Sequence, residues 1–321
     1  EMPSLQQNPA LKMSAVSGKV RTKAPRLLAR ILLYAVLIDL AFLFLYPFLY
    51  ILITSVKTNR DLLDITVQWI PRSLKWENFS MAIKACNFFS NLKNSSIYTI
   101  FGTAGHLLSC AFIGYGFARY RFPGRKLLFL AVLLSIIVPV QTIIIPLYLV
   151  YVNMGILGTY LPVILPTFFG FGLRGGLFIF IFRQFFMNLP RELENAAKVD
   201  GCGFLRTYVR IVLPIAKPAI VVTLVLSMVW HWNDFYEPGI YAAKPDMYTL
   251  PASIQALIPI MESPTRALAF FSSFDMPNQE AVINNAVFMA ATLMAILPII
   301  LIFAVLQRGF MQGIERTGLV E

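Results

Sequence analysis

A polar segment between long apolar stretches holds the residues with the most chemical information in this chain. This polar segment, residues 192–218, reads ELENAAKVDGCGFLRTYVRIVLPIAKP and contains acidic, small and turn-forming residues at close spacing. Glu192 and Glu194 complement the positive start of a helix, and Asp200-Gly201 is a turn pair whose glycine adopts a left-handed conformation at low cost. The segment therefore predicts a short helix, a tight turn and a second helix. We interpret this arrangement as a docking site for a partner.

One face of the first predicted helix is small and partly acidic. Four residues follow the helical spacing i, i+3, i+4, i+7 and so share this face: Leu193, Ala196, Ala197 and Asp200. Two alanines there would let the backbone of a partner come close. An amphipathic membrane anchor would instead place large apolar residues opposite basic ones, so the pattern favours a soluble partner over lipid headgroups. The second helix is predicted over about 204–213, ending at Pro214.

Motifs for catalysis are absent from the sequence. It contains no Gly-x-x-x-x-Gly-Lys-Ser/Thr loop for nucleotide phosphates, no His-Glu-x-x-His zinc motif and no Gly-x-Ser-x-Gly nucleophile turn. Cys86, Cys110 and Cys202 are odd in number and far apart, and His106 and His231 are the only histidines. We therefore expect no catalytic, cofactor-binding or metal-binding residue, and no hydrolysis by the chain itself.

The elements that position the polar segment are predicted to be membrane-spanning helices. Hydrophobic residues make up 58% of the 321 residues and charged residues 13%, whereas a soluble domain carries about a quarter charged residues. Six stretches reach the roughly 20 apolar residues of a span: residues 31–54, 97–118, 127–152, 161–186, 215–232 and 281–306. The expected fold class is an all-α integral membrane protein with six transmembrane helices. Prolines predict kinks in the third and fourth stretches: Pro139, Pro146, Pro162 and Pro166.

The distribution of lysine and arginine predicts the orientation. Over alternate connections, eighteen lie on the side of the N-terminal tail and the polar segment, eight lie on the opposite side, and Arg174 lies within a span. Because these residues concentrate in cytoplasmic loops, both termini and the polar segment are predicted to be cytoplasmic. The net charge of +11 is thus a topology signal and does not indicate nucleic-acid binding. The predicted parts are a tail (1–27), a six-span domain (28–307) and a C-terminal tail (308–321).

Polar residues inside or at the ends of spans are the candidates for a substrate path. Arg174 places a guanidinium in the fourth span, where it could hydrogen-bond a hydroxyl or carboxylate, form an ion pair or extend to the interface. Aromatic rings such as that of Trp232 suit stacking on sugar faces, but they are also enriched at any membrane interface. The remaining candidates lie at span ends, where packing at the interface or helix capping is the structural alternative: Trp232, Asn233, Asp234, Asn284 and Asn285.

The motifs of this chain resemble those of bacterial ABC importer permeases. The cytoplasmic signature of that family has two alanines, a glycine and Ile-x-Leu-Pro at fixed spacing, matched here by Ala196, Ala197, Gly201, Ile211, Leu213 and Pro214. The acidic residue that usually precedes the alanines is replaced by Asn195. Three further segments look like those of maltose-type carbohydrate permeases: Phe117-Ala-Arg-Tyr-Arg-Phe-Pro-Gly, Trp232-Asn-Asp-Phe and Gln307-Arg-Gly-Phe-Met-Gln-Gly. The resemblance covers about residues 28–319.

The resemblance implies a permease subunit in the bacterial plasma membrane, in contact with lipid. It would move a carbohydrate, with an oligosaccharide expected, by alternating access after delivery from an extracytoplasmic binding protein. Its partners would be a second homologous permease and two ATPase subunits, which would bind ATP and magnesium in place of this chain. The coupling segment, residues 188–214, would dock on an ATPase through Glu192, Glu194, Asn195, Ala196, Ala197, Asp200, Gly201, Leu213 and Pro214.

Other function classes fit the sequence less well. A permease for another small polar solute stays open, because the sequence does not identify the sugar. A secondary transporter would have internal repeats and paired ionisable residues at the midplane, and neither is evident. A membrane scaffold would leave Arg174 and the proline-broken spans unexplained, and a membrane enzyme would need a catalytic constellation.

Overall fold

The computed structural model describes residues 23–242, 244–263 and 284–317, which form helices joined by turns without any strand. The all-α prediction is confirmed for this part of the chain. Three described helices are long and apolar enough to cross a membrane: α1 (Lys23–Ser55), α4 (Phe88–Arg119) and α16 (Asn285–Thr317). They match the first, second and last predicted spans, although residues 281–283 lie outside the described ones. Most of α1 belongs to a separate unit that ends at Tyr50.

The third predicted span, 127–152, is a bent pair of helices, and the fifth, 215–232, corresponds to the second member of another bent pair. α5 (Arg125–Ile137) and α6 (Val140–Asn153) meet at 104°. This break falls at Pro139, whose ring nitrogen carries no hydrogen for helix bonding. A helical run over Phe204–Ile215 meets α12 (Lys217–Asn233) at 76°. Within the described residues the candidate spans thus number three, or up to five with each bent pair as one, so the prediction of six is confirmed only in part.

The fourth predicted span, 161–186, is not one continuous helix. It consists of α7 (Leu161–Ile164), the 3-10 turn η1 (Leu165–Phe169) and α8 (Gly175–Asn188). The loop at 170–174 interrupts it, because Gly170 at φ +71° and Gly172 at φ +94° take backbone conformations that a helix excludes. The prolines predicted a kink, whereas the glycines produce a full break.

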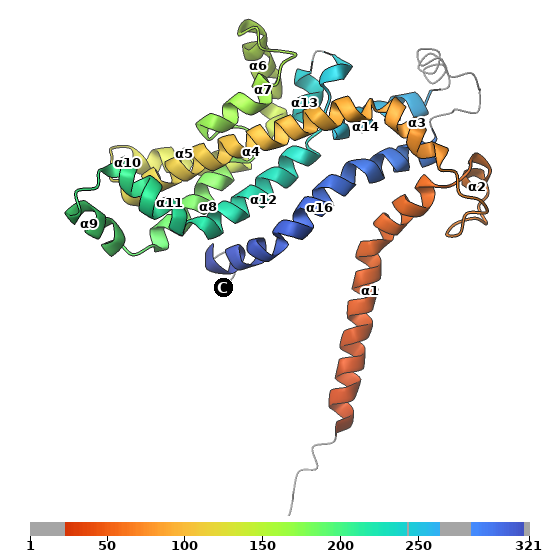
Figure 1. The fold of residues 1–321 in the computed structure, drawn as a ribbon, viewed down its shortest axis with the longest axis horizontal. Coiled ribbons are helices and arrows are strands. Elements are labelled where there is room, and N and C mark those ends of the chain that lie inside the picture. Colours follow the sequence, from red (N-terminus) through yellow and green to blue (C-terminus); the bar gives the residue numbers. More distant parts are fainter. Residues whose placement is uncertain (1–22, 243, 264–283, 318–321) are drawn as a thin grey trace, which may run out of the picture. The chain divides into compact units, whose positions relative to one another are not determined.

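The helices α4, α8 and α12 run side by side, and α16 lies against α12 (Figure 1). Gly114 lets α4 and α8 approach closely, since a Cβ built there would lie 2.7 Å from Phe182 Cβ. Buried aromatic side chains fill the core that these helices share with the polar segment: Tyr115, Phe178, Phe182, Phe186 and Tyr208.

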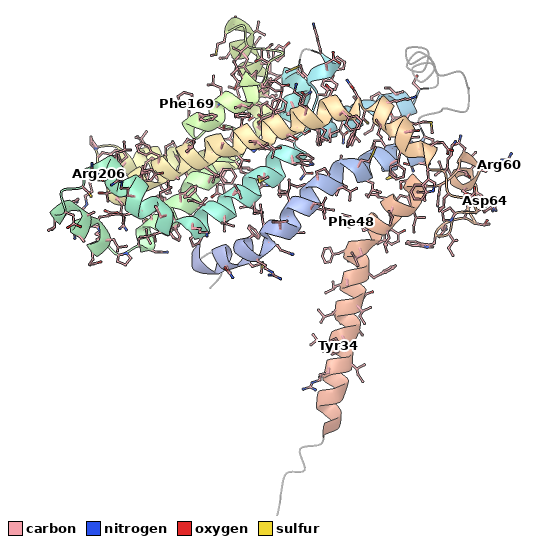
Figure 2. The ribbon with its side chains drawn as sticks, in the orientation of Figure 1. Tyr34, Phe48, Arg60, Asp64, Phe169 and Arg206 are labelled. Carbon is pink, nitrogen blue, oxygen red and sulfur yellow. The ribbon has the colours of Figure 1, made fainter. Side chains whose placement is uncertain are left out.

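Short elements gather at the two ends of this bundle. One end holds α9 (Glu192–Val199), α10 (Phe204–Thr207), the π turn η2 (Tyr208–Val212) and α11 (Leu213–Ile215). The other end holds α2 (Asn59–Leu63), α3 (Glu77–Ala85), α13 (Tyr236–Tyr241), η3 (Pro245–Met247) and α14 (Leu250–Met261). Figure 2 shows Arg206 at the first end and Arg60 and Asp64 at the second. The polar segment and the α13–α14 connection therefore lie at opposite ends of the bundle.

Candidate functional site

A helix and a tight turn form at the polar segment, as its residues predict. The chain leaves α9 through Gly201, whose φ of +74° is the left-handed conformation expected of this glycine. The amide of Cys202 donates to Ala197 O at 2.9 Å, and the amide of Gly201 donates to Lys198 O at 3.1 Å. These bonds satisfy carbonyls at the end of α9 in a Schellman arrangement. The glycine thus sets the direction in which the chain continues.

The second helix is longer and less regular than predicted. The elements α10, η2 and α11 form one run that continues past Pro214 to Ile215. Because proline cannot donate to the carbonyl of the preceding turn, a regular α-helix is disfavoured here, and the wider π turn lies just before it. The run then ends at Ala216, where the chain bends into α12.

Most residues predicted to dock a partner are exposed at this end of the bundle: Glu192, Asn195, Ala196, Asp200, Gly201 and Pro214. Leu213 is half-buried. Ala197 is 2% exposed and belongs to the interior of the chain, so Ala196 is the alanine that a partner can reach. Val199 and Leu205 are exposed apolar side chains near it, at 87% and 62%. Small, acidic and apolar groups therefore share a surface that a soluble protein can cover.

Glu194 has a partner inside the chain that sequence reasoning missed. Arg119, the last residue of α4, places its Nε 2.8 Å from Glu194 Oε1, and the two side chains are only 5% and 13% exposed. Arg119 Nη2 also donates to Leu189 O at 2.7 Å. The Nε–H does not point along the line to the carboxylate oxygen, so the contact is an ion pair by distance more than an aligned hydrogen bond. The Glu194 carboxylate therefore makes its contact within this chain.

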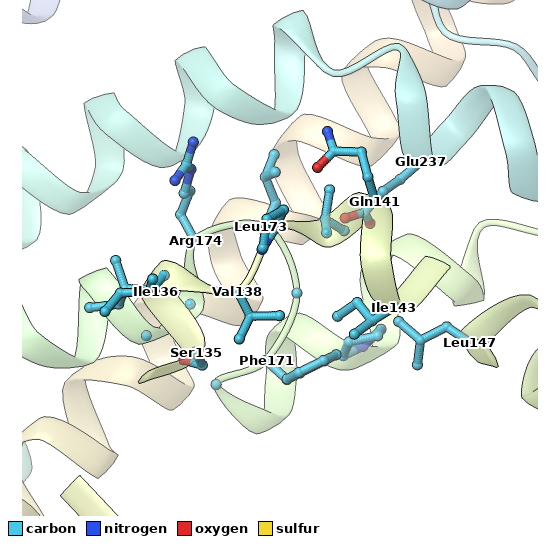
Figure 3. Close-up of a pocket in the computed structure, with 18 of the residues that line it drawn as sticks. Ser135, Ile136, Val138, Gln141, Ile143, Leu147, Phe171, Leu173, Arg174 and Glu237 are labelled. Atoms are coloured by element: carbon cyan, nitrogen blue, oxygen red, sulfur yellow. The ribbon is translucent and has the colours of Figure 1, made fainter. Parts of the chain in front are cut away.

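A cavity of about 360 Å³ opens beside the two interrupted stretches (Figure 3). Its walls come from the end of α5, the start of α6, the loop before α8 and Glu237 on α13. The volume lies at the lower end of the range of about 300–1,000 Å³ for small-molecule sites, whose walls are mainly apolar with a few polar groups. The polar side chains here are Ser135, Gln141, Tyr151, Arg174 and Glu237.

Arg174 lines this cavity in an unusual backbone conformation. Its φ of +63° is left-handed, which is uncommon for a residue other than glycine and frequent at ligand sites. The guanidinium carbon lies 5.5 Å from the centroid of the Trp230 ring, within range of a cation–π contact. The side chain is exposed. The predicted membrane arginine thus contacts an aromatic ring and borders a cavity, and within the described residues no carboxylate pairs with it.

Two acidic side chains lie close together at the start of α13. Burial raises the pKa of Glu237 to about 8, and the neighbouring Asp234 carboxyl adds to this shift. Burial likewise raises the pKa of Asp234 to about 6, although its Oδ1 accepts the backbone amides of Tyr236 at 2.9 Å and Glu237 at 3.4 Å. Asp234 Oδ2 is buried and has no hydrogen-bond partner among the described residues. Glu237 therefore presents a carboxyl to the cavity that is neutral over part of the physiological pH range.

The other predicted substrate-path residues have separate surroundings. Trp232 is 4% exposed and donates from Nε1 to Ala295 O at 2.9 Å, so its indole packs between α12 and α16. Asn233 is exposed, and its Nδ2 donates to Val229 O at 2.8 Å. Asn284 accepts the amide of Val287 at 3.0 Å and so caps α16, the structural alternative considered for it. Asn285 is exposed at the first position of α16. None of the four lines the cavity that Arg174 borders.

Comparison with known proteins places this architecture in a family. Residues 111–316, which include the polar segment and the cavity, match the family described as binding-protein-dependent transport system inner membrane component. The chain belongs to this family. The permease is 30% identical over 292 residues to the arabinooligosaccharides transport system permease protein AraQ of Bacillus subtilis (strain 168), covering 90% of this chain and 95% of that one.

Further similarities cover nearly the same length of the permease. It is 27% identical over 278 residues to the sn-glycerol-3-phosphate transport system permease protein UgpE of Yersinia enterocolitica, which covers 85% of this chain and 91% of the relative. A chain in the crystal structure of a bacterial ABC transporter involved in the import of the acidic polysaccharide alginate shares its fold. The TM-score is 0.71 at 20% identity, over 89% of this permease and 98% of that chain.

Proposed function

We propose that this permease is one membrane subunit of an ATP-driven importer that translocates a carbohydrate, with an oligosaccharide as the substrate. The similarity to an arabinooligosaccharide permease over 90% of the chain supports this substrate class. The subunit works with a second homologous permease, two ATPase subunits and an extracytoplasmic binding protein. ATP and magnesium bind to the ATPases, and this chain itself is not catalytic.

The observation that carries the proposal is the exposed helix–turn–helix at one end of the bundle. The coupling segment, residues 188–214, docks in a groove of an ATPase through Glu192, Asn195, Ala196, Asp200, Gly201 and Pro214, with Leu213 at its edge. Ala197 and Glu194 support that surface from within. When the ATPases close on ATP, the docked segment moves and biases the spans toward an outward-open state.

The cavity beside α8 is the part of the substrate path that this subunit provides. Arg174 and Glu237 offer hydrogen-bonding groups for sugar hydroxyls, while apolar walls contact the faces of the ring. A binding protein releases substrate at the end of the bundle that holds α13 and α14. The residues nearer that end are Asn233, Asp234 and Asn285. Trp232 and Asn284 contribute by fixing the helices that carry these residues.

A second solute class has a specific observation in its favour. The similarity to a glycerol phosphate permease, together with an exposed Arg174 on the cavity, fits a small phosphorylated substrate. Arginine binds phosphate oxygens through its planar fork of donors. The two classes differ in charge, so a panel of substrates separates them.

The test is ATP hydrolysis by the complex in liposomes with its binding protein. Arabinooligosaccharides, sn-glycerol 3-phosphate and alginate oligosaccharides are supplied in turn. We expect a neutral oligosaccharide to stimulate hydrolysis and Gly201→Asp to abolish that stimulation, because a side chain strains the backbone at φ +74° and the turn directs the coupling segment.

Gly203→Asp is the matched control. Gly203 is exposed in the same turn, has φ −71° and has open space at its Cβ position, so its replacement adds the same charge without strain. If only sn-glycerol 3-phosphate stimulated ATP hydrolysis, the substrate would belong to the second class, small phosphorylated solutes. A Gly201→Asp complex whose ATP hydrolysis is stimulated as strongly as that of wild type would refute docking through this turn.

A further inference from the structure

The last turn of α4 is joined to both helices of the polar segment. Arg119 pairs with Glu194 of α9 at 2.8 Å. The ring of Tyr115 stacks on that of Phe204 in α10 with centroids 5.8 Å apart, and Tyr120 meets Phe204 edge-on at 5.2 Å. A displacement of the polar segment as one body therefore acts on the end of α4 through charge on one side and through aromatic packing on the other.

The same helix contacts the loop that borders the cavity. His106 Nε2 lies 3.3 Å from Phe171 O, and Ser109 Oγ donates to Thr167 O at 2.6 Å. Phe171 is one of the residues that line the cavity. From Arg119 to His106 an α-helix extends about 20 Å. Thus α4 is a continuous rod that touches the polar segment at its end and the cavity loop along its length.

The charges at the end of α4 are not explained by stability alone. Burying two charges costs desolvation energy, and apolar residues of similar volume often stabilise a protein equally well or better. An ion pair does supply a fixed geometry when both groups are held. Arg119 holds Glu194 within α9 and, through Leu189 O, the connection that leads from α8 into α9.

We propose that the Arg119–Glu194 ion pair is the positioning contact that transmits movement of the polar segment to α4, and through α4 to the cavity loop. The inference rests on the proposed function, in which α9 and α10 dock on an ATPase subunit. The carboxylate of Glu194 is directed inward to Arg119, whereas its neighbour Asn195 is exposed and uncharged. The ion pair therefore leaves the outer surface of α9 free for docking.

The test uses the complete complex in liposomes, with a radiolabelled arabinooligosaccharide as the probe. Four forms are compared with wild type: Arg119→Met, Glu194→Gln, both together, and the charge exchange Arg119→Glu with Glu194→Arg. Arg308→Met, at an exposed arginine of α16 outside the polar segment, is the control. The readouts are co-purification of the ATPase subunits and the amount of probe taken up per ATP hydrolysed.

We expect every form to retain the ATPase subunits. Uptake per ATP should fall about fivefold or more in the single variants and in the neutral double variant, a typical size for coupling between sites, and the charge exchange should recover much of it. A merely structural pair predicts instead that the neutral double variant equals wild type, and that result would overturn the inference. Loss of the ATPase subunits would also overturn it, because the pair would then serve docking.

A different experimental result would contradict the proposed function itself. A wild-type complex that does not retain ATPase subunits, or takes up no solute from the panel, contradicts the proposal that this permease belongs to an ATP-driven carbohydrate importer. Wild-type uptake with unchanged variants contradicts only the role of the ion pair.

Discussion

Glu237 carries a carboxyl that water hardly reaches, and this makes the chain sensitive to pH. Its pKa is raised from 4.5 to about 8, first by burial and then by Asp234, so the folded chain retains a proton that the unfolded chain loses. Stability contributed by the neutral carboxyl is complete below about pH 4.5 and is lost as the pH rises through about 8. Each pKa unit corresponds to about 1.4 kcal/mol. We therefore expect the melting temperature of the purified permease to fall between about pH 5 and pH 8.5.

Replacing the carboxyl by an amide tests this assignment. Glu237→Gln stays neutral, so its melting temperature should depend less on pH than that of wild type, with the remaining slope due to Asp234, whose pKa is raised to about 6. Tyr151 and Tyr241 also interact electrostatically with Glu237, but tyrosine phenols ordinarily titrate near pH 10, above this range. Glu262→Gln, at the exposed carboxyl of the residue that follows α14, should retain the wild-type profile. Equal slopes for Glu237→Gln and wild type would exclude Glu237 as the source.

The contact between α4 and α12 depends on one glycine. A Cβ built on Gly102 would lie 2.5 Å from His231 Nε2, closer than real side chains approach. His231 is 2% exposed, and its Nδ1 lies 2.9 Å from Ser227 O, so the ring has little freedom to move away. We expect Gly102→Ala to destabilise the chain by about 1–3 kcal/mol, the usual cost of overpacking. Thermal unfolding in detergent measures this.

Gly116 supplies the matched substitution on the same helix. No atom of the described residues lies within 4 Å of a Cβ built there, so Gly116→Ala should be neutral or stabilising by up to about 1 kcal/mol through helix propensity. If the two alanine variants melted at the same temperature, close approach at Gly102 would not limit the packing of α4 on α12.

How much of each element the sequence predicts depends on the range of the forces that form it. Gly201 and Pro139 act on their own backbone, so the left-handed turn and the break between α5 and α6 follow from residue type. The side on which an indole packs depends on tertiary contacts, and the Trp232 indole donates to Ala295 O of α16. Arg119 and Glu194 lie on different helices, and no local pattern marks them as partners. The prolines of the fourth stretch predict a kink from the sequence alone. The positive φ angles that complete the break at 170–174 depend on packing.

At the scale of the whole molecule, the distribution of charge and the arrangement of the bundle predict opposite locations for its two ends. The polar segment lies on the side that holds eighteen of the lysines and arginines, and the α13–α14 connection lies on the side that holds eight. Because positive residues are retained in the cytoplasm, Lys198 on α9 should be cytoplasmic and Lys244 before η3 should be external. Both side chains are exposed, so each position can report its own side.

Single cysteines at these two positions measure the orientation directly. In a background with Cys86, Cys110 and Cys202 replaced by serine, Lys244→Cys should react with a membrane-impermeant maleimide in right-side-out vesicles and Lys198→Cys only in inverted ones. Serine for Cys86 and Cys110 adds a hydroxyl to buried sites, so uptake by this background must first match wild type. The reverse pattern would place the α9 surface outside the cell, where no ATPase can dock. Labelling of both positions in one type of vesicle would mean that the two ends of the bundle lie on the same side of the membrane. That result would contradict alternating access, which needs the two ends on opposite sides.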